Sequence, residues 1–226
     1  MIIINLRDPS FEVPKVNGTK PLFFIHGFRV DYEESVNISQ KIDDYLALDD
    51  FGLVSWPGNS PLGVLDYFTA HKNANECGKA LAEKWNNATI PSFLTHSLGA
   101  RVALNYAMVK EVDTLIMFAP AVEVGALVNE FKGAKIKKIF MLGSRCDNVL
   151  KFLFPIGEDG RGALGYFGPS EDEKKLISPP YFVPESLDCG HDDYLPEGKR
   201  NLWHKTLSFA KQAFLEHPIT WPGKSG

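Results

Sequence analysis

Ser97 occupies a position typical of a nucleophilic serine. The apolar run 91–96 ends directly before it, and the helix-like segment 98–110 starts directly after it. A sharp turn between strand and helix lifts the serine oxygen clear of the backbone and aims the helix N-terminus at developing negative charge. Gly99 is the small residue that the pattern G-x-S-x-G requires after the serine, whereas Thr95 replaces the glycine before it. The alternative role for Ser97 is to cap the helix.

A second apolar run, 21–26, ends in the sequence His26-Gly27-Phe28. In folds with such a serine turn, the loop after an early strand supplies one oxyanion-hole N–H, and the residue after the nucleophile supplies the other. The backbone N–H groups of Phe28 and Leu98 are therefore the predicted donors. Gly27 allows the backbone to approach a substrate closely. We expect His26 to brace this loop by hydrogen bonding.

A general base must follow the serine, with an acid between them in the chain. His191 lies in the glycine-flanked stretch 187–194, just before the last helix-like segment, so its loop can reach the same edge of the sheet. We predict that His191 is the base. The other candidates lie in or beside helix-like segments, in the tail, or next to the serine but pointing elsewhere: His71, His204, His217 and His96.

Asp147 is the predicted acid. It follows the apolar run 136–143 by four residues, and a carboxylate there can hold the imidazole tautomer and stabilise the imidazolium. Glu123, just past the run 114–119, is the runner-up, because some hydrolases place the acid one strand earlier. The alternative for Asp147 is a solvated acid on a loop.

The elements that must position these residues alternate along the chain. Short apolar runs predict strands, and helical spacing or composition predicts helices between them. This alternation indicates an α/β fold, a mostly parallel sheet flanked by helices. The length suits a single domain, residues 1–226. The predicted strands are 2–6, 21–26, 52–56, 91–96, 114–119, 136–143 and, more weakly, 181–187; the predicted helices are 32–48, 65–86, 98–110 and 198–216.

Residues 148–180 fit neither type of element, and we expect a long glycine- and aromatic-rich loop after the acid strand. One interpretation is a cover whose aromatic side chains line the substrate pocket; the other is a surface loop with those side chains buried beneath it. Trp56, at the end of a predicted strand, could also wall the pocket, although core packing is the expected role for a lone tryptophan. The candidate pocket residues are Phe28, Trp56, Phe152, Phe154, Tyr166 and Phe167.

Four short segments, in this order, resemble bacterial esterase/lipase-like α/β-hydrolases: His26-Gly27-Phe28, Val54-Ser55-Trp56-Pro57, His96-Ser97-Leu98-Gly99 and Gly190-His191-Asp192-Asp193-Tyr194. The likeness runs from about Pro21 to the last predicted helix. It implies the α/β-hydrolase fold, the roles given above for serine, histidine and aspartate, and hydrolysis of a carboxylic ester with a small or medium acyl group. The alternatives are a thioesterase, amidase or acyltransferase variant, and a catalytically silent protein that binds a ligand or partner.

Composition narrows the possible partners and cofactors. The net charge is −4 without a cluster of basic residues, which argues against nucleic acid or an anionic membrane as the main partner. No run is apolar and long enough to span a membrane, and the first apolar run has no basic segment before it, so we expect a strand there, no signal peptide and a cytoplasmic protein. The three cysteines predict no disulfide framework. No metal-ligand or dinucleotide-binding pattern is present, so neither a metal nor a cofactor is expected.

Overall fold

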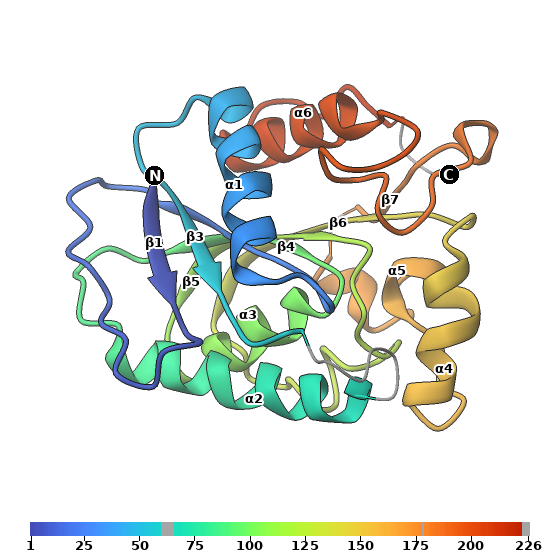
Figure 1. Ribbon diagram of the computed structural model, residues 1–226. Helices are drawn as coiled ribbons and strands as arrows, with labels where there is room; N and C mark the ends of the chain where they lie inside the picture. Colours follow the sequence, from blue (N-terminus) through green and yellow to red (C-terminus); the bar gives the residue numbers. More distant parts are fainter. Residues whose placement is uncertain (60–65, 178, 223–226) are drawn as a thin grey trace.

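Seven strands form one sheet in the order β1-β3-β2-β4-β5-β6-β7, and all neighbouring strands run parallel (Figure 1). The structure, a computed structural model, describes residues 1–59, 66–177 and 179–222. The predicted α/β class, a parallel sheet flanked by helices, is confirmed. Because the strands are parallel, residues that follow them collect at one edge of the sheet, which is where ligands bind in open α/β folds.

The strands are β1 (Ile2–Asn5), β2 (Leu22–Ile25), β3 (Phe51–Ser55), β4 (Ser92–His96), β5 (Val112–Phe118), β6 (Ile136–Gly143) and β7 (Tyr181–Phe182). The four residues of β2 are all buried, as expected for a strand covered on both faces. The prediction of a strand over 181–187 is wrong beyond Phe182. Pro184 has no N–H to donate to a neighbouring strand, and a 3₁₀ turn follows at Glu185–Leu187.

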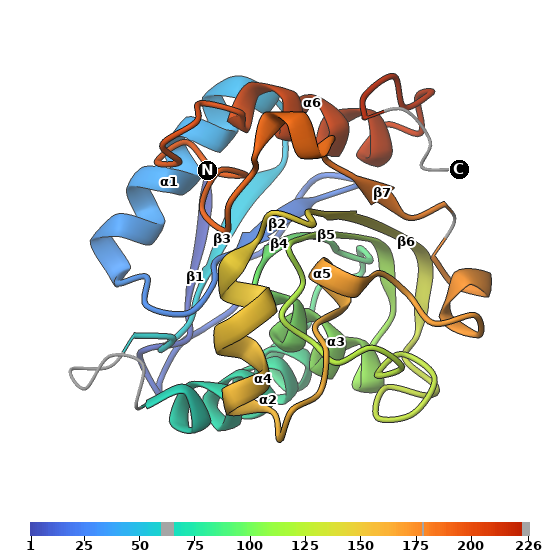
Figure 2. The same ribbon diagram turned by 90° about the vertical axis from the view of Figure 1, so that its right-hand side faces the viewer.

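The main helices are α1 (Tyr32–Leu46), α2 (Tyr67–Lys84), α3 (Gly99–Val109) and α6 (Trp203–Phe214). They agree with the predicted helices to within a few residues, although Leu65, the predicted start of the second, lies outside the described residues. Figure 2 shows α1 and α6 on one face of the sheet and α2 and α3 on the other. None of the described helices is both long enough and apolar enough to cross a membrane.

The segment 148–180 was expected to be a loop, and this expectation is wrong for much of it. It contains a π-helical turn, η2 (Val149–Leu153), which continues into α4 (Phe154–Gly157), and then α5 (Leu164–Phe167) and a 3₁₀ turn (Glu173–Lys175). The helical turns form because apolar side chains, such as Leu150, Phe154 and Leu164, are buried against the rest of the protein. In Figure 2, α4 lies in front of the strand ends.

Candidate active site

Ser97 lies in a tight turn between β4 and α3. Its φ of 53° is in the left-handed region, which non-glycine residues adopt rarely and mainly where the surrounding structure imposes it. Gly99, two residues later, touches β2 so closely that a Cβ atom there would lie 2.4 Å from the Ile25 carbonyl oxygen and 2.5 Å from that of His26. Only glycine fits this position without movement of the backbone. The turn expected from the sequence is therefore present.

Thr95 does not prevent this turn, although it stands where the sequence pattern has glycine. Its side chain is fully buried, and its Oγ1 donates to the Ile116 carbonyl oxygen of β5 at 3.3 Å. The hydroxyl therefore has a partner inside the sheet, and the buried polar group is satisfied.

The structure brings the three predicted catalytic side chains together. His191 Nδ1 lies 2.7 Å from Asp147 Oδ2, and His191 Nε2 lies 2.8 Å from Ser97 Oγ. An ionised carboxylate only accepts hydrogen bonds, so Nδ1 carries the imidazole proton and Nε2 is free to accept the serine hydroxyl proton. Residues from the ends of β4 and β6 and from the loop before α6 thus form one chain of hydrogen bonds.

Asp147 is fully buried, and two contacts hold its carboxylate. Oδ2 accepts from His191, and Oδ1 accepts from the Leu150 N–H at 2.9 Å. Burial disfavours the charged form of His191, but the charge and hydrogen bond of Asp147, with the charge of Asp192, outweigh it and raise the pKa of His191 above its ordinary value. The site therefore stabilises the imidazolium that forms when histidine takes a proton.

Glu123, the runner-up acid, has a different partner. Its carboxylate accepts two hydrogen bonds from the exposed Arg161 guanidinium, at 2.6 and 2.7 Å, and it has no contact with His191 among the described residues. Glu123 follows β5 and so lies at the expected edge of the sheet. Its side chain, however, pairs with Arg161, in the segment that follows Asp147, and not with His191.

Leu98, one predicted oxyanion donor, directly follows Ser97 in the chain. The loop of the other donor, Phe28, is distant in sequence but lies against the serine, since a Cβ atom at Gly27 would be 3.0 Å from Ser97 Cβ. Within the described residues, neither the Phe28 N–H nor the Leu98 N–H donates to a protein acceptor. His26 braces the loop as expected: Nδ1 donates to the Gly27 carbonyl oxygen at 2.9 Å, and Nε2 accepts from the Trp56 N–H at 3.2 Å. Burial lowers the pKa of His26 to about 3, so its ring is neutral.

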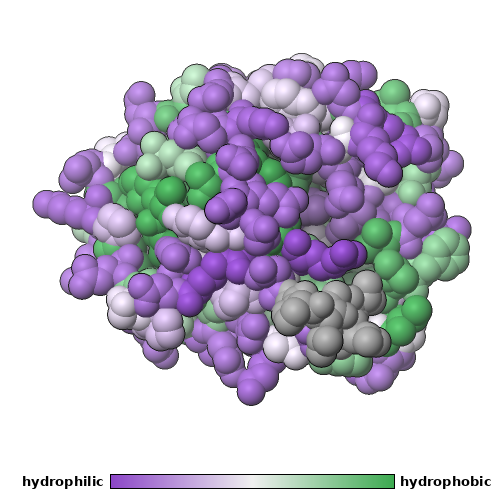
Figure 3. Space-filling view, viewed as in Figure 1, coloured by the Kyte–Doolittle hydropathy of each residue, from purple (hydrophilic) through white to green (hydrophobic). Residues whose placement is uncertain are grey.

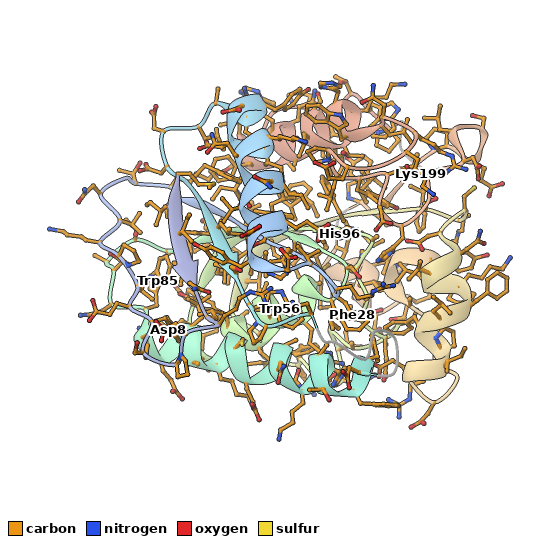
Figure 4. The ribbon with its side chains drawn as sticks, viewed as in Figure 1. Asp8, Phe28, Trp56, Trp85, His96 and Lys199 are labelled. Atoms are coloured by element: carbon orange, nitrogen blue, oxygen red, sulfur yellow. The ribbon has the colours of Figure 1, made fainter. Side chains whose placement is uncertain are left out.

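Trp56 is placed in the core and not on a pocket surface, which corrects its assignment as a pocket residue. Its side chain is fully buried and stacks on His26, with ring centroids 5.6 Å apart, and its Nε1 donates to the His26 carbonyl oxygen at 2.8 Å. A buried indole needs a partner for its N–H, and this carbonyl supplies it. Figure 4 shows Trp56 and Phe28 above α2, with Phe28 on the side of α4.

The remaining candidate pocket residues fall into two groups. Phe154 is buried and packs edge-on against Tyr67, which in turn packs edge-on against Phe28, with ring centroids 6.5 and 5.8 Å apart. A continuous aromatic row therefore leads from α4 to the loop that carries a predicted oxyanion donor. Phe152 and Phe167, by contrast, are 57% and 52% exposed.

Tyr166 is half-buried and packs edge-on against Phe167. The outer side of η2 and α4 is apolar, and Figure 3 shows apolar side chains on the part of the surface where α4 lies. The exposed apolar residues of these two elements are Val149, Phe152, Leu153 and Ile156.

Three residues that hold the loop of His191 were not predicted from the sequence. Ser144 Oγ donates to the Cys189 carbonyl oxygen at 2.7 Å, and Asp193 accepts from the Gly190 N–H at 2.8 Å. The third is His96, whose Nε2 lies 2.8 Å from the His191 carbonyl oxygen. Only Asp193 left a local signal, a carboxylate three residues after a glycine. The other two contacts join distant parts of the chain.

A parallel sheet with a left-handed serine between β4 and α3, and a histidine and an acid on later loops at the same edge, is the arrangement of the α/β hydrolases. Residues 10–176 match the family described as "Alpha/beta hydrolase of unknown function (DUF900)", and the chain belongs to this family. The predicted relationship to α/β-hydrolases is thereby confirmed. No curated protein matches the sequence.

Solved structures with a similar fold include an uncharacterized protein from Bacillus cereus ATCC 10987, with 18% identity and a TM-score of 0.51 over 88% of this chain and 62% of that one. Esterase PE8 has 15% identity and a TM-score of 0.49, over 90% and 95% of the two chains. A predicted CIB-like hydrolase from Thermoplasma acidophilum has 18% identity and a TM-score of 0.48, over 87% of this chain and 89% of that one. At 18% identity, the similarity to the Bacillus protein concerns the fold alone.

Proposed function

We propose that the protein is a serine hydrolase that cleaves carboxylic esters with a small or medium acyl group. The observation that carries the proposal is the unbroken chain of hydrogen bonds from Asp147 through His191 to Ser97, with the serine held in the left-handed conformation. A serine that only capped α3 would not need a histidine and a buried carboxylate behind it. We also propose a cytoplasmic location and a single domain, both from the sequence.

In the first half of the reaction, His191 Nε2 takes the proton of Ser97 Oγ as this oxygen attacks the ester carbonyl carbon. The carbonyl oxygen becomes an oxyanion, which the Phe28 and Leu98 N–H groups stabilise. The C–O bond to the leaving alcohol then breaks, and His191 returns the proton to the alcohol oxygen. The acyl group remains on Ser97 as an ester.

In the second half, a water molecule replaces the alcohol. His191 takes a proton from the water as its oxygen attacks the acyl carbon, and the same two N–H groups hold the oxyanion. The bond from Ser97 Oγ to the acyl carbon breaks, and the proton returns to Ser97. The products are an alcohol and a carboxylic acid, and Asp147 stabilises the imidazolium in both halves.

Labelling with a fluorophosphonate probe tests the proposal against a silent hydrolase-fold protein, because only an activated serine displaces fluoride from phosphorus. We expect about one label per chain on the peptide that contains Ser97, and none on the Ser97→Ala protein. Ser10→Ala is the matched control, since Ser10 is exposed and lies on the loop after β1; it should label like wild type. A folded wild-type protein that takes up no label would support the silent, ligand-binding alternative.

We further propose that the aromatic row from Phe154 to Phe28 limits the acyl group. Phe154→Leu should change the ratio of kcat/KM between 4-nitrophenyl hexanoate and acetate by about tenfold, because each methylene in an apolar pocket contributes about 1–3 kcal/mol of discrimination. Leucine keeps most of the buried volume, so the fold is retained.

Phe167→Leu is the control for this prediction, since this side chain is 52% exposed and should leave the ratio unchanged. Melting temperatures of both proteins are measured in parallel. If Phe154→Leu lowers the melting temperature while the ratio stays at the wild-type value, Phe154 is a core residue and the pocket lies elsewhere.

A further inference from the structure

His96 connects the strand of the proposed nucleophile directly to the loop of the proposed base. It is the last residue of β4, next to Ser97, and only 4% of its surface is exposed. Its Nε2 lies 2.8 Å from the carbonyl oxygen of His191, and the two imidazole rings are 4.9 Å apart. Figure 4 shows His96 in the interior of the molecule. The proposed reaction uses neither nitrogen of this ring.

The contact defines the protonation of His96. A carbonyl oxygen only accepts hydrogen bonds, so Nε2 carries the proton and donates it. Nδ1 has no hydrogen-bond partner among the described residues and faces Gly27, where a Cβ atom would lie 3.0 Å from it. Burial, together with the nearby charge of His191, lowers the pKa of His96 to about 4. The ring is therefore a neutral donor, and it does not repel a protonated His191.

His191 needs such a contact because it lies outside regular secondary structure and makes two short hydrogen bonds at once, to Asp147 and to Ser97. Its neighbours Cys189 and Gly190 are tied to Ser144 and Asp193. Among the described residues, the hydrogen bond to the main chain of His191 itself is the one that its carbonyl oxygen accepts from His96. A misplacement of about 1 Å in a catalytic group can cost about 10²-fold in rate.

We propose that His96 is a positioning residue, which holds the His191 main chain so that the imidazole reaches both Ser97 Oγ and Asp147. This role rests on the proposed function, although the placement of His191 can be measured without turnover. His96 touches neither the substrate nor the reacting atoms. What distinguishes His96 is that it directly precedes the serine and donates a hydrogen bond from a neutral, rigid ring to the His191 carbonyl oxygen.

Three variants separate this hydrogen bond from packing. His96→Phe keeps a flat ring and removes the donor, His96→Leu removes it with a smaller side chain, and His96→Gln keeps an N–H donor at similar reach. We expect the first two to lower kcat, per site titrated with the fluorophosphonate probe, by about 10²-fold with KM within about twofold. His96→Gln should recover most of this loss. His204→Phe, at an exposed position on α6, is the control and should match wild type.

The second measurement is the pKa of His191, followed by NMR of the imidazole during a pH titration. Burial lowers the pKa of His191, and two carboxylates raise it: Asp147, by charge and hydrogen bond, and Asp192, by charge. If the ring moves away from Asp147 in His96→Phe and His96→Leu, the pKa of His191 falls, and in His96→Gln it returns toward the wild-type value. A merely structural role for His96 would lower the melting temperature without this pattern.

The result that overturns the proposal is a wild-type pKa of His191 and a wild-type kcat per titrated site in whichever of His96→Phe and His96→Leu folds. Failure of the proposed function has a different signature. In that case wild-type protein neither labels nor turns over esters, while the NMR titration still reports whether His96 holds His191 against Asp147.

Discussion

Ser97→Ala is expected to lower kcat for an activated short-chain ester, such as 4-nitrophenyl acetate, by on the order of 10⁴ to 10⁶-fold. Alanine has no oxygen to attack the carbonyl carbon, so no acyl-enzyme forms. A residual rate above that in water remains, because the Phe28 and Leu98 N–H groups and the binding site are unchanged. Steady-state kinetics on folded protein, checked by circular dichroism, measure the loss.

The substitution should have little effect on the fold, since serine and alanine are both small and adopt the left-handed conformation at similar cost. Ser10→Ala, purified in the same way, controls for contaminating esterases and should keep wild-type kcat. If the Ser97→Ala protein hydrolysed the ester as fast as wild type, Ser97 would not be the nucleophile and the hydrogen-bond chain would have another purpose.

Asp147→Asn is expected to lower kcat by about 10⁴-fold while the protein stays folded. The asparagine amide can donate to His191 Nδ1, which leaves the proton on Nε2, the nitrogen that faces Ser97. In this tautomer His191 cannot accept the serine proton. Glu123→Gln is the matched control: it also replaces a carboxylate with an amide, but at a residue paired with Arg161. The opposite ranking of the two variants would move the acid to the end of β5.

The pH dependence of kcat/KM should differ between the wild-type protein and Asp147→Asn in a defined direction. His191 must be neutral to act as a base, so kcat/KM falls as the pH drops through the pKa of His191, which lies above its ordinary value. In Asp147→Asn the raising effect of the carboxylate is lost while burial remains. The acid limb of the residual activity therefore moves to lower pH. An acid limb at the wild-type position would show that Asp147 does not set the pKa of His191.

Much of the sheet could be predicted because its strands are covered on both faces. Strands such as β2, with the sequence Leu22-Phe23-Phe24-Ile25, appear in the sequence as short apolar runs with polar or turn residues between them. The proposed catalytic residues could be found for the same reason. In a parallel sheet the ends of these runs meet at one edge, so a serine, an acid and a histidine that follow them in order are candidates for a single site.

The segment after Asp147 was harder to predict. Its glycines and prolines indicate a loop, yet Val149–Leu153 and Phe154–Gly157 are helical. Short helices have little intrinsic stability and form here because Leu150 and Phe154 are buried against other elements. Tertiary packing therefore overrides the local preference of this segment. Trp56 is a different case, because core packing was the role expected for a lone tryptophan, and its indole is fully buried.

The sequence by itself determined the fold class, the seven strands, six of them to within two residues at each end, and the residues that follow each strand. Only the tertiary structure decided that His191 contacts Asp147 and not Glu123, that Glu123 pairs with Arg161, and that His96 donates to the His191 carbonyl oxygen. The physical reason is that the spacing of apolar residues, which indicates strands and helices, is a property of local sequence. A hydrogen bond between side chains, or to a main-chain carbonyl far along the chain, depends on distances and directions that are fixed only when the elements pack together.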